Sequence, residues 1–345
     1  MQKSFYILNA QILLSYMKIA FYFRNVPGGI KTHVDMLDKQ IQLLGHETKI
    51  IDQSTLKSRM MGDFYGFENG ASKIKEETSD CDILHIHHGA TFSEFLLPSY
   101  SFTKEISIIN TFHIPIGGGF QGVLSSSVIR LIAWRYSRIS KAYISVSSNV
   151  ASKIKRYNKT LTIPNGVDVG LFHPTDERVY DENSIRFGYL GRLSPEKNVL
   201  TMIKAADELG IELLIAGGGP LYERVKGCEN ERIKVLGYVD DASEFLRSID
   251  VFVLPSHLEA QPIVLLEAMA SGLPVIATDV GDNRFFIDDN GVLCGTSEDE
   301  IKSAITKILD NDLKTMARRS REVAEEHTWR HVAEETIKVY QNALK

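Results

Sequence analysis

Two glutamates on either side of a proline could hold a polar ligand. Glu259 precedes Pro262, and Glu267 lies within the apolar run that follows. Proline is favoured in the first turn of a helix, so we expect Glu259 on a loop and Glu267 more than one turn inside the helix. Carboxylates accept hydrogen bonds from hydroxyls, and a helix start attracts phosphate. The segment therefore predicts a site for a ligand with both groups. Two paired surface carboxylates, the alternative, fit the apolar surroundings of Glu267 poorly.

A cationic pair follows a strand-like segment earlier in the chain. The segment 191–198 reads Gly-Arg-Leu-Ser-Pro-Glu-Lys-Asn. We expect Arg192 and Lys197 to emerge together where the strand ends and the next helix begins. A planar guanidinium and a compact ammonium suit the two phosphate groups of a diphosphate. A pair of solvated surface charges is the alternative.

Gly28 and Gly29 stand between a strand-like run and a helix-like run. Glycines let the backbone approach a phosphate closely, and a helix start supplies unpaired N–H groups. A tight turn without a ligand is the alternative. The spacing G-x-G-x-x-G is absent here, which argues against a dinucleotide site in this half of the chain.

Histidines end two neighbouring strand-like runs. His113 ends the run from Ser107, where it could contact a sugar or move a proton; a structural histidine is the alternative. His85, His87 and His88 end the preceding run. Alternating residues of one strand point to opposite faces, and no carboxylate cluster completes a ligand set. We therefore expect neither a metal site nor a cofactor.

Short apolar runs alternate with amphipathic stretches, which predicts parallel βαβ units. The first set of strands is expected at 18–23, 48–52, 82–88, 107–113 and 142–147, with a helix at 31–45. Beyond a linker at 163–184, strands are expected at 185–191, 211–217, 233–237, 251–255 and 274–278, with helices at 197–209, 220–227, 241–248, 262–272 and 298–311. Ligands bind beyond the carboxyl ends of such strands, where each motif above falls.

The composition bounds the class of protein. The chain has 345 residues, more than one typical α/β domain and about right for two. Its 43% hydrophobic and 24% charged residues are typical of a soluble globular protein. Three cysteines far apart, without zinc or redox spacing, favour a reducing cytoplasm.

The charge is unevenly distributed. Residues 1–170 carry 19 Lys and Arg against 13 Asp and Glu, whereas the remainder carries 20 against 31. Residues 106–159 hold eight Lys or Arg and no acid. A helix expected at 124–141 combines basic and apolar side chains: Arg130, Arg135, Arg138, Lys141, Val128, Leu131, Ile132 and Trp134. This pattern suggests an anionic membrane or a phosphate-bearing acceptor, with an ordinary basic surface helix as the alternative. No nucleic-acid module is visible.

The amino-terminal segment 4–16 is apolar but too short to cross a bilayer, and no small-residue cleavage site follows it. The run KIAFYF directly after Met17 reads as a buried first strand. We expect Met17 to be a natural start and residues 1–16 to be a peripheral extension. A signal or anchor is the alternative.

Taken in order, these motifs resemble the retaining GT-B glycosyltransferases of family 4. The resemblance runs from about residue 18 to the end and rests on the glycine pair, His113, PNGVD (164–168), GRLSPEKN (191–198), AGGGP (216–220) and E-x7-E (259–267). Residues 328–344 resemble the family's last helix, which crosses back onto the first domain. The implied fold is α/β, with two doubly wound Rossmann-like domains facing a cleft. Residues 1–170 with 329–345 form the acceptor side, and 171–328 bind the nucleotide-sugar.

The resemblance also implies roles for individual residues. His113 contacts the sugar near the reacting carbon, Arg192 and Lys197 neutralise the diphosphate, and Glu259 holds sugar hydroxyls. The expected donor-binding residues are Gly28, Gly29, Gly217, Gly218, Gln261, Pro262, Ile263 and Glu267. No metal is needed, because Arg and Lys replace it, and the sequence contains no Asp-x-Asp.

The sequence departs from the family pattern at two places. Ala260-Gln261 follows Glu259 where most relatives have Gly-Phe or Gly-Tyr, so the sugar preference is expected to differ. Gly117–Gly119 form an unusually flexible loop after His113, which would face the acceptor and order on binding.

The expected activity is therefore that of a hexosyltransferase-type enzyme. It moves a sugar from a UDP- or GDP-linked donor to an acceptor hydroxyl, with retention and without metal. The departing phosphate accepts the acceptor's proton. The favoured acceptor is a lipid-linked or cell-envelope glycan, with polysaccharide, small-molecule and protein acceptors left open. We expect no nucleic-acid partner, and a location in the cytoplasm at the inner face of the membrane. The alternatives are a sugar-nucleotide epimerase of the same fold, a non-catalytic nucleotide-sugar-binding protein and a nucleic-acid binder.

Overall fold

The computed structural model describes residues 16–24, 28–52, 74–89, 106–114, 119–175, 180 and 184–345, and within 119–125 it describes the backbone alone. The expected extension up to residue 15 lies outside these ranges. So do Gly117 and Gly118 of the expected acceptor loop.

The first sheet is parallel and has the strand order β2-β1-β3-β4-β5-β6. Its strands are β1 (Lys18–Phe23), β2 (Glu47–Asp52), β3 (Ile83–His88), β4 (Ser107–Phe112), β5 (Ser140–Ser145) and β6 (Thr160–Thr162). The helices between them are α2 (Gly29–Leu43), α5 (Gly119–Tyr136) and α6 (Ser148–Ile154). Apolar residues of α2 pack on one face of the sheet, and those of α5 and α6 pack on the other.

The second sheet is also parallel, in the order β12-β11-β10-β7-β8-β9. Its strands are β7 (Arg186–Leu190), β8 (Glu212–Ala216), β9 (Ile233–Gly237), β10 (Val251–Leu254), β11 (Val275–Thr278) and β12 (Gly291–Cys294). The helices are η3 (Pro195–Lys197), α7 (Val199–Leu209), α8 (Tyr222–Lys226), α9 (Ala242–Arg247), α10 (Ile263–Ala270), η4 (Asn283–Phe285), α11 (Glu298–Leu309), α12 (Leu313–Glu325) and α13 (Trp329–Leu344). Helices α7 and α11 cover one face, and α9 and α10 cover the other.

The strand predictions from apolar runs are confirmed in both sheets. Every residue of β4 and β10 is buried, as expected for central parallel strands covered on both faces. The sequence reasoning missed β6, β12, α6 and α12. The strands β6 and β12 read Thr-Leu-Thr and Gly-Val-Leu-Cys, so neither has an apolar run like that of β10, Val-Phe-Val-Leu.

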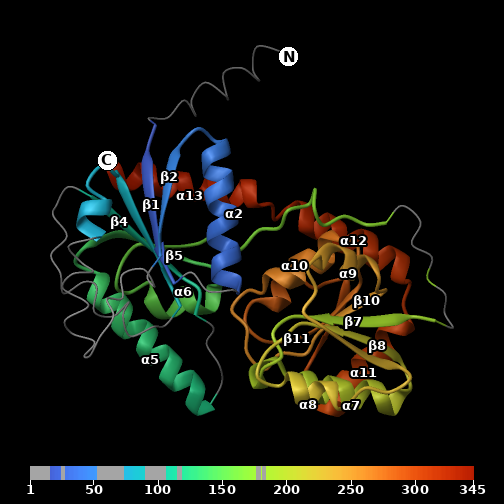
Figure 1. The fold of residues 1–345 in the computed structure, drawn as a ribbon. Coiled ribbons are helices and arrows are strands. Elements are labelled where there is room, and N and C mark those ends of the chain that lie inside the picture. Colours follow the sequence, from blue (N-terminus) through green and yellow to red (C-terminus); the bar gives the residue numbers. More distant parts are fainter. Residues whose placement is uncertain are drawn as a thin grey trace, which may run out of the picture.

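The last helix, α13, belongs to the first sheet although it follows the second in sequence. Its residues Trp329, Val332 and Tyr340 lie in the same core cluster as β1 and α2. The chain crosses back at Thr328, which pairs with Val167 in an isolated parallel bridge. A Cβ on the adjacent Gly166 would lie 2.6 Å from the Trp329 backbone nitrogen, so this crossing requires glycine. The crossing helix expected from the resemblance is therefore present (Figure 1).

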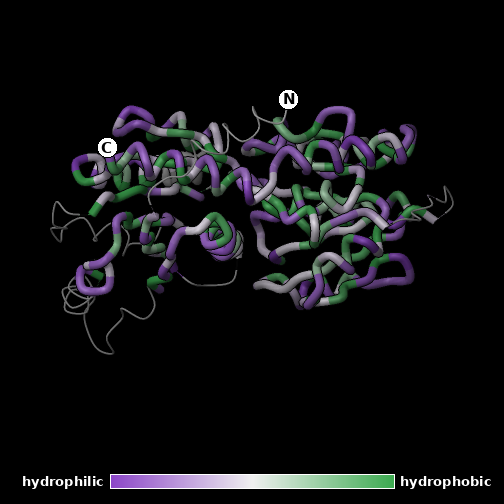
Figure 2. The backbone as a smooth tube through the Cα atoms, turned by 90° about the horizontal axis from the view of Figure 1, so that it is seen from above, coloured by the Kyte–Doolittle hydropathy of each residue, from purple (hydrophilic) through white to green (hydrophobic). Residues whose placement is uncertain are grey.

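Two lobes result, and they lie side by side in both views (Figures 1 and 2). Hydrophobic and hydrophilic segments are interspersed through each lobe in Figure 2, as expected where each lobe buries its own sheet. In the described part of the chain, none of the helices combines the length and the apolar character that crossing a membrane requires.

The basic helix differs from its prediction. It ends at Tyr136, so Arg138 lies in the following turn and Lys141 lies in β5. Ile132 is buried against the sheet and supplies no surface. The outward apolar side chains are Val128, Leu131 and Trp134, which are 41%, 46% and 54% exposed.

Candidate functional site

The loop before α10 carries a buried ion pair. The Lys197 ammonium at the end of η3 lies 2.6 Å from Glu259 Oε1, and the Ser256 hydroxyl donates to the same oxygen at 2.7 Å. The side chain of Glu259 is 8% exposed and that of Lys197 is 23% exposed. The two residues lie 62 positions apart in sequence. The fold thus brings together the cation expected at a diphosphate and the carboxylate expected at a sugar.

Helix α10 begins where the proline predicted it. Pro262 is the N-cap residue, in an extended conformation, and Ile263 is the first helical residue. Glu267 lies in the second turn and is partly exposed. Burial of its carboxyl group raises its pKa to about 7. A carboxyl group with this pKa changes its charge near neutral pH.

Glycines hold the loops after β7 and β8 against each other. Gly217 has φ +134°, and a Cβ there would lie 1.8 Å from the carbonyl oxygen of Gly191. The Leu193 amide donates to the Gly218 carbonyl at 2.8 Å. A Cβ on Gly218, in contrast, would have no atom within 4 Å. Arg192, which is exposed, therefore lies on the same loop pair as the expected nucleotide-contacting glycines.

The start of α2 has the features of an anion site. Gly28 is its N-cap, with φ +143° and no side-chain cap, and the first turn holds no acidic residue. A Cβ on either Gly28 or Gly29 would meet no atom within 4 Å, so space is open beside both residues. A helix of 15 residues that begins with uncapped amides attracts an anion to its first turn.

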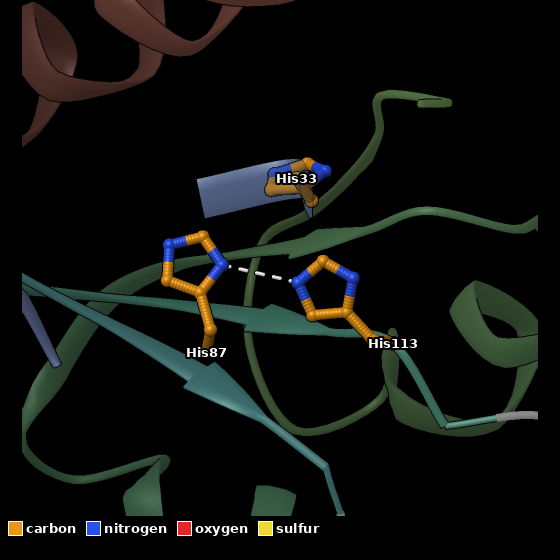
Figure 3. Close-up of side chains that lie close together, drawn as sticks. All are labelled: His33, His87 and His113. Atoms are coloured by element: carbon orange, nitrogen blue, oxygen red, sulfur yellow. Dashed lines mark hydrogen bonds between the residues drawn. The ribbon is translucent and has the colours of Figure 1, made fainter. Parts of the chain in front are cut away.

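Three histidines from different elements meet in the first lobe (Figure 3). The His87 Nδ1 of β3 lies 3.0 Å from the His113 Nε2 at the end of β4. The ring of His33 from α2 stands edge-on to that of His113, with their centroids 4.6 Å apart. His33 and His87 are buried, whereas His113 is partly exposed. Burial lowers the pKa of His33 to about 4 and holds the pKa values of His87 and His113 well below the usual range, so all three rings are neutral at pH 7.

The strand histidines divide between the faces of the sheet as their alternation predicted. His85 and His87 lie on one face, with ring centroids 4.1 Å apart. His88 lies against Phe112 and Tyr136 on the other. The H-x-H-H spacing therefore does not form a ligand set by itself, and the cluster depends on His33 and His113.

A buried hydrogen-bonded chain joins the two lobes. His33 Nδ1 lies 2.7 Å from Asn165 Oδ1. The Asn165 amide nitrogen Nδ2 donates to the Gln261 carbonyl at 2.8 Å, and its backbone N–H donates to Gln261 Oε1 at 2.9 Å. Ile263 packs into the core cluster of the first lobe. The loop that carries Glu259 is thus held by the first lobe as well as by its own.

A second contact between the lobes involves a helix start. The Ser148 backbone N–H and hydroxyl donate to the Asp282 carboxylate at 2.6 and 2.9 Å. The Asp282 backbone N–H donates to the carbonyl of Ala260 at 3.0 Å. The sequence reasoning gave no role to His33, Asn165, Ser148 or Asp282. Only the presence of Asn165 in the PNGVD motif could have signalled one of them.

The chemical groups of these residues suit a ligand that carries phosphate and hydroxyl groups. Arg192, Lys197 and the starts of α2 and α10 offer positive charge or unpaired amides. Glu259 and Glu267 offer hydroxyl acceptors. His113 offers a neutral ring beside them.

Comparison with known families and proteins shows what this chain is similar to. A family model described as "Glycosyltransferase Family 4" matches residues 27–171, and one described as "Glycosyl transferases group 1" matches residues 184–311. An uncharacterized glycosyltransferase of Methanocaldococcus jannaschii is 25% identical over 362 residues, covering 96% of this chain and 99% of that protein. The phosphatidyl-myo-inositol mannosyltransferase of Mycolicibacterium smegmatis is 28% identical over 365 residues, covering 93% of this chain and 92% of that protein.

Solved structures share the fold. The sucrose-phosphate synthase of Thermosynechococcus elongatus superimposes with a TM-score of 0.76 at 18% identity, covering 94% of this chain and 98% of that one. Anabaena HepE in complex with UDP-glucose superimposes with a TM-score of 0.75 at 17% identity, covering 94% and 99%. The two-lobed GT-B architecture expected from the sequence is therefore confirmed.

Proposed function

The chain belongs to the family 4 glycosyltransferases, and we propose that it transfers a sugar from a nucleoside-diphosphate sugar to an acceptor hydroxyl with retention of configuration and without a catalytic metal ion. One observation carries the proposal. The Lys197–Glu259 ion pair involves the loop before α10, and the first lobe binds that same loop through Asn165 and Gln261. In this proposal, residues 1–170 with 329–345 form the acceptor side, and residues 171–328 bind the donor.

The diphosphate of the donor is assigned to the cationic loop. The guanidinium of Arg192 and the ammonium of Lys197 oppose its charge, and the first turns of α2 and α10 supply amides. The open space beside Gly28 and Gly29 supports this assignment, because a phosphate can approach the backbone there. Lys197 is held by Glu259 at 2.6 Å, so its position is set before a ligand arrives.

The sugar and the ribose are assigned to the two glutamates. Glu259 accepts from hydroxyls of the transferred sugar, and the backbone of Gln261–Ile263 completes that pocket beside it. Glu267 accepts from the ribose hydroxyls, and these hydrogen bonds are stronger when its carboxyl group is ionised. Gly217 lets the loops after β7 and β8 approach each other, and the open space beside Gly218 leaves room for the nucleotide.

The reaction follows from these positions. The bond between the anomeric carbon and the diphosphate oxygen breaks, and its electron pair leaves with the diphosphate. Cations and helix starts stabilise that developing charge. The acceptor oxygen bonds the anomeric carbon on the face that the diphosphate left, and the acceptor's proton passes to a departing phosphate oxygen. Because its pKa is lowered by burial, His113 stays neutral and does not repel the positive charge that develops on the anomeric carbon.

We further propose that the acceptor is membrane-associated and that the protein works at the cytoplasmic face of a membrane. Helix α5 exposes Leu131 and Trp134 beside Arg130 and Arg138, a combination suited to anionic lipid. The mannosyltransferase relative is named for an acceptor that is itself a lipid, phosphatidyl-myo-inositol. A lipid-linked or cell-envelope glycan is the acceptor class that agrees with both observations.

The test is ligand-induced thermal stabilisation by UDP, GDP, ADP and TDP, each with and without EDTA. A ligand that binds the folded state raises the melting temperature. One diphosphate should do so, and EDTA should not remove the effect. A shift that EDTA abolishes would refute metal-independent binding. Absence of a shift with all four would contradict the donor site, and donor turnover that does not depend on any acceptor would favour an epimerase.

A further inference from the structure

We propose that His33, His87 and His113 form a binding site for a first-row transition metal ion of the Zn²⁺ class. One ring nitrogen of each residue lies within 4.8 Å of those of the other two. The residues come from α2, β3 and the end of β4, so their side chains converge from three sides (Figure 3). The H-x-H-H run of β3 does not form this cluster by itself, because its side chains lie on both faces of the sheet.

The distances are close to those of a metal site. Zinc binds histidine nitrogen at about 2.0–2.1 Å, so two nitrogens of a tetrahedral site lie roughly 3.3 Å apart. His87 Nδ1 and His113 Nε2 are 3.0 Å apart. The nitrogen of His33 lies within 4.8 Å of both, so the three side chains have to close by at most about 1.5 Å to reach this spacing.

Hydrogen bonds leave a lone pair on His33. The Asn165 Nδ2 donates to the Gln261 carbonyl, so the Asn165 oxygen faces His33 as an acceptor. His33 Nδ1 must then carry the proton. Because the ring is neutral, its Nε2 holds the lone pair that a metal ion requires. Asn165 thus orients this ring as outer-shell partners orient metal-binding histidines.

His87 also has an unused ring nitrogen. Its Nε2 is buried and has no hydrogen-bond partner among the residues that the structure describes. One proton lies between His87 Nδ1 and His113 Nε2; when a metal ion binds both nitrogens, this proton moves to the other nitrogen of the ring that carries it, so no proton is released. His113 is the partly exposed member, so the fourth ligand, water or an anion, enters from its side.

The ligand chemistry selects the metal class. Imidazole nitrogens suit Zn²⁺, Cu²⁺, Ni²⁺ and Co²⁺, whereas Mg²⁺ and Ca²⁺ require oxygen ligands, which this cluster lacks among its three side chains. If His113 contacts the donor sugar as proposed above, a metal ion on its Nε2 competes with that contact. Occupancy then inhibits transfer and does not take part in it.

The test uses the full-length protein, stripped with EDTA and titrated with Co²⁺ as a spectroscopic probe. We expect one equivalent to bind with the intense visible absorption of a tetrahedral site, and Zn²⁺ to displace it. His87→Phe keeps an aromatic ring against Phe21 and removes both nitrogens. His113→Ala is a second variant at a partly exposed position, in case the first fails to fold. Each should weaken binding by at least about 100-fold, more than outer-shell changes do.

The controls are two exposed histidines away from the cluster, replaced together in the variant His173→Ala with His331→Ala. Binding should be unchanged in that variant. Loss of binding there, or equal binding to His113→Ala, would assign the metal to the surface and overturn the proposal. The proposal would also be overturned if bound Co²⁺ showed only the weak visible absorption of an octahedral ion. Stabilisation by UDP and the other diphosphates, measured on the same samples, reports separately on the donor site.

Discussion

Replacement of Lys197 by alanine tests the assigned chemistry most directly. The variant removes one cation from the diphosphate site and leaves Glu259, whose side chain is 8% exposed, with the Ser256 hydroxyl as its remaining polar partner at that oxygen. Loss of one preorganised group that stabilises developing charge costs about 10²–10³ in kcat, or about 2.7–4 kcal/mol. We expect Lys197→Ala to lower turnover by this factor.

The folding cost of the same change is expected to be smaller. Breaking a fully buried ion pair costs about 3–5 kcal/mol. Lys197 is 23% exposed, so water already screens the pair, and Glu259 keeps the hydrogen bond from Ser256. We therefore expect a loss of about 1–2 kcal/mol in the free energy of unfolding, since exposed pairs contribute less than 1 kcal/mol.

Lys302→Ala is the matched control. The Lys302 side chain is also 23% exposed and lies 2.7 Å from Glu208, but it lies on α11, outside the candidate site. The assays are single-turnover release of the nucleoside diphosphate and urea unfolding of both variants. Lys302→Ala should lose stability but retain turnover. The assignment of Lys197 to the diphosphate would be refuted if the folded Lys197→Ala protein kept turnover within about threefold of wild type. Such a decrease is far smaller than the loss of a charge-stabilising group should cause.

The remaining predictions concern Glu267, the glycines Gly217 and Gly218, and helix α5. Because burial raises the pKa of Glu267 to about 7, the affinity for the nucleoside diphosphate should fall as the pH drops from 8 to 6, and Glu267→Gln should remove this dependence in a calorimetric titration. The same shift means that Glu267 binds a proton more tightly in the folded than in the unfolded protein. The free energy of unfolding should therefore decline as the pH rises from about 4.5 to 7 and then level off. If affinity and stability depend on pH equally in wild type and Glu267→Gln, both predictions are contradicted. Gly217→Ala should lower the melting temperature strongly, because the new Cβ would lie 1.8 Å from a carbonyl oxygen, whereas Gly218→Ala meets no atom within 4 Å and should melt like wild type. Trp134→Glu should reduce sedimentation with anionic vesicles by roughly tenfold, and Tyr238→Glu, at an 83% exposed position in the second lobe, should not; equal sedimentation of the two would contradict a lipid contact through α5.

The contact between the lobes shows where local sequence patterns stop being informative. Asn165 and Gln261 are 96 positions apart. The residues around them in the sequence form no pattern that predicts a hydrogen bond between the two. Gln261 stands where most members of the family have an aromatic residue. In the structure, its side-chain oxygen accepts a hydrogen bond from the Asn165 backbone N–H. The residue type alone does not predict this bond.

The missed elements have a similar cause. The helix α6 has seven residues, begins with a Ser147 cap and follows directly after a strand, so its short apolar face merges with the preceding run. The basic helix was extended too far because Arg138 and Lys141 continue its charge pattern. The helix ends in a turn after Tyr136 because the next strand, β5, pairs with β4.

The two parallel sheets and the order of the motifs along the chain can be predicted from local sequence patterns. The apolar runs of both halves form strands, and Pro262 marks the start of α10. Which of these groups meet depends on how the elements pack. Two contacts depend on elements far apart in the chain: the pairing of Lys197 with Glu259 and the convergence of His33, His87 and His113. Sequence periodicity cannot predict them, because it indicates which face of an element is buried and not which other element packs against that face.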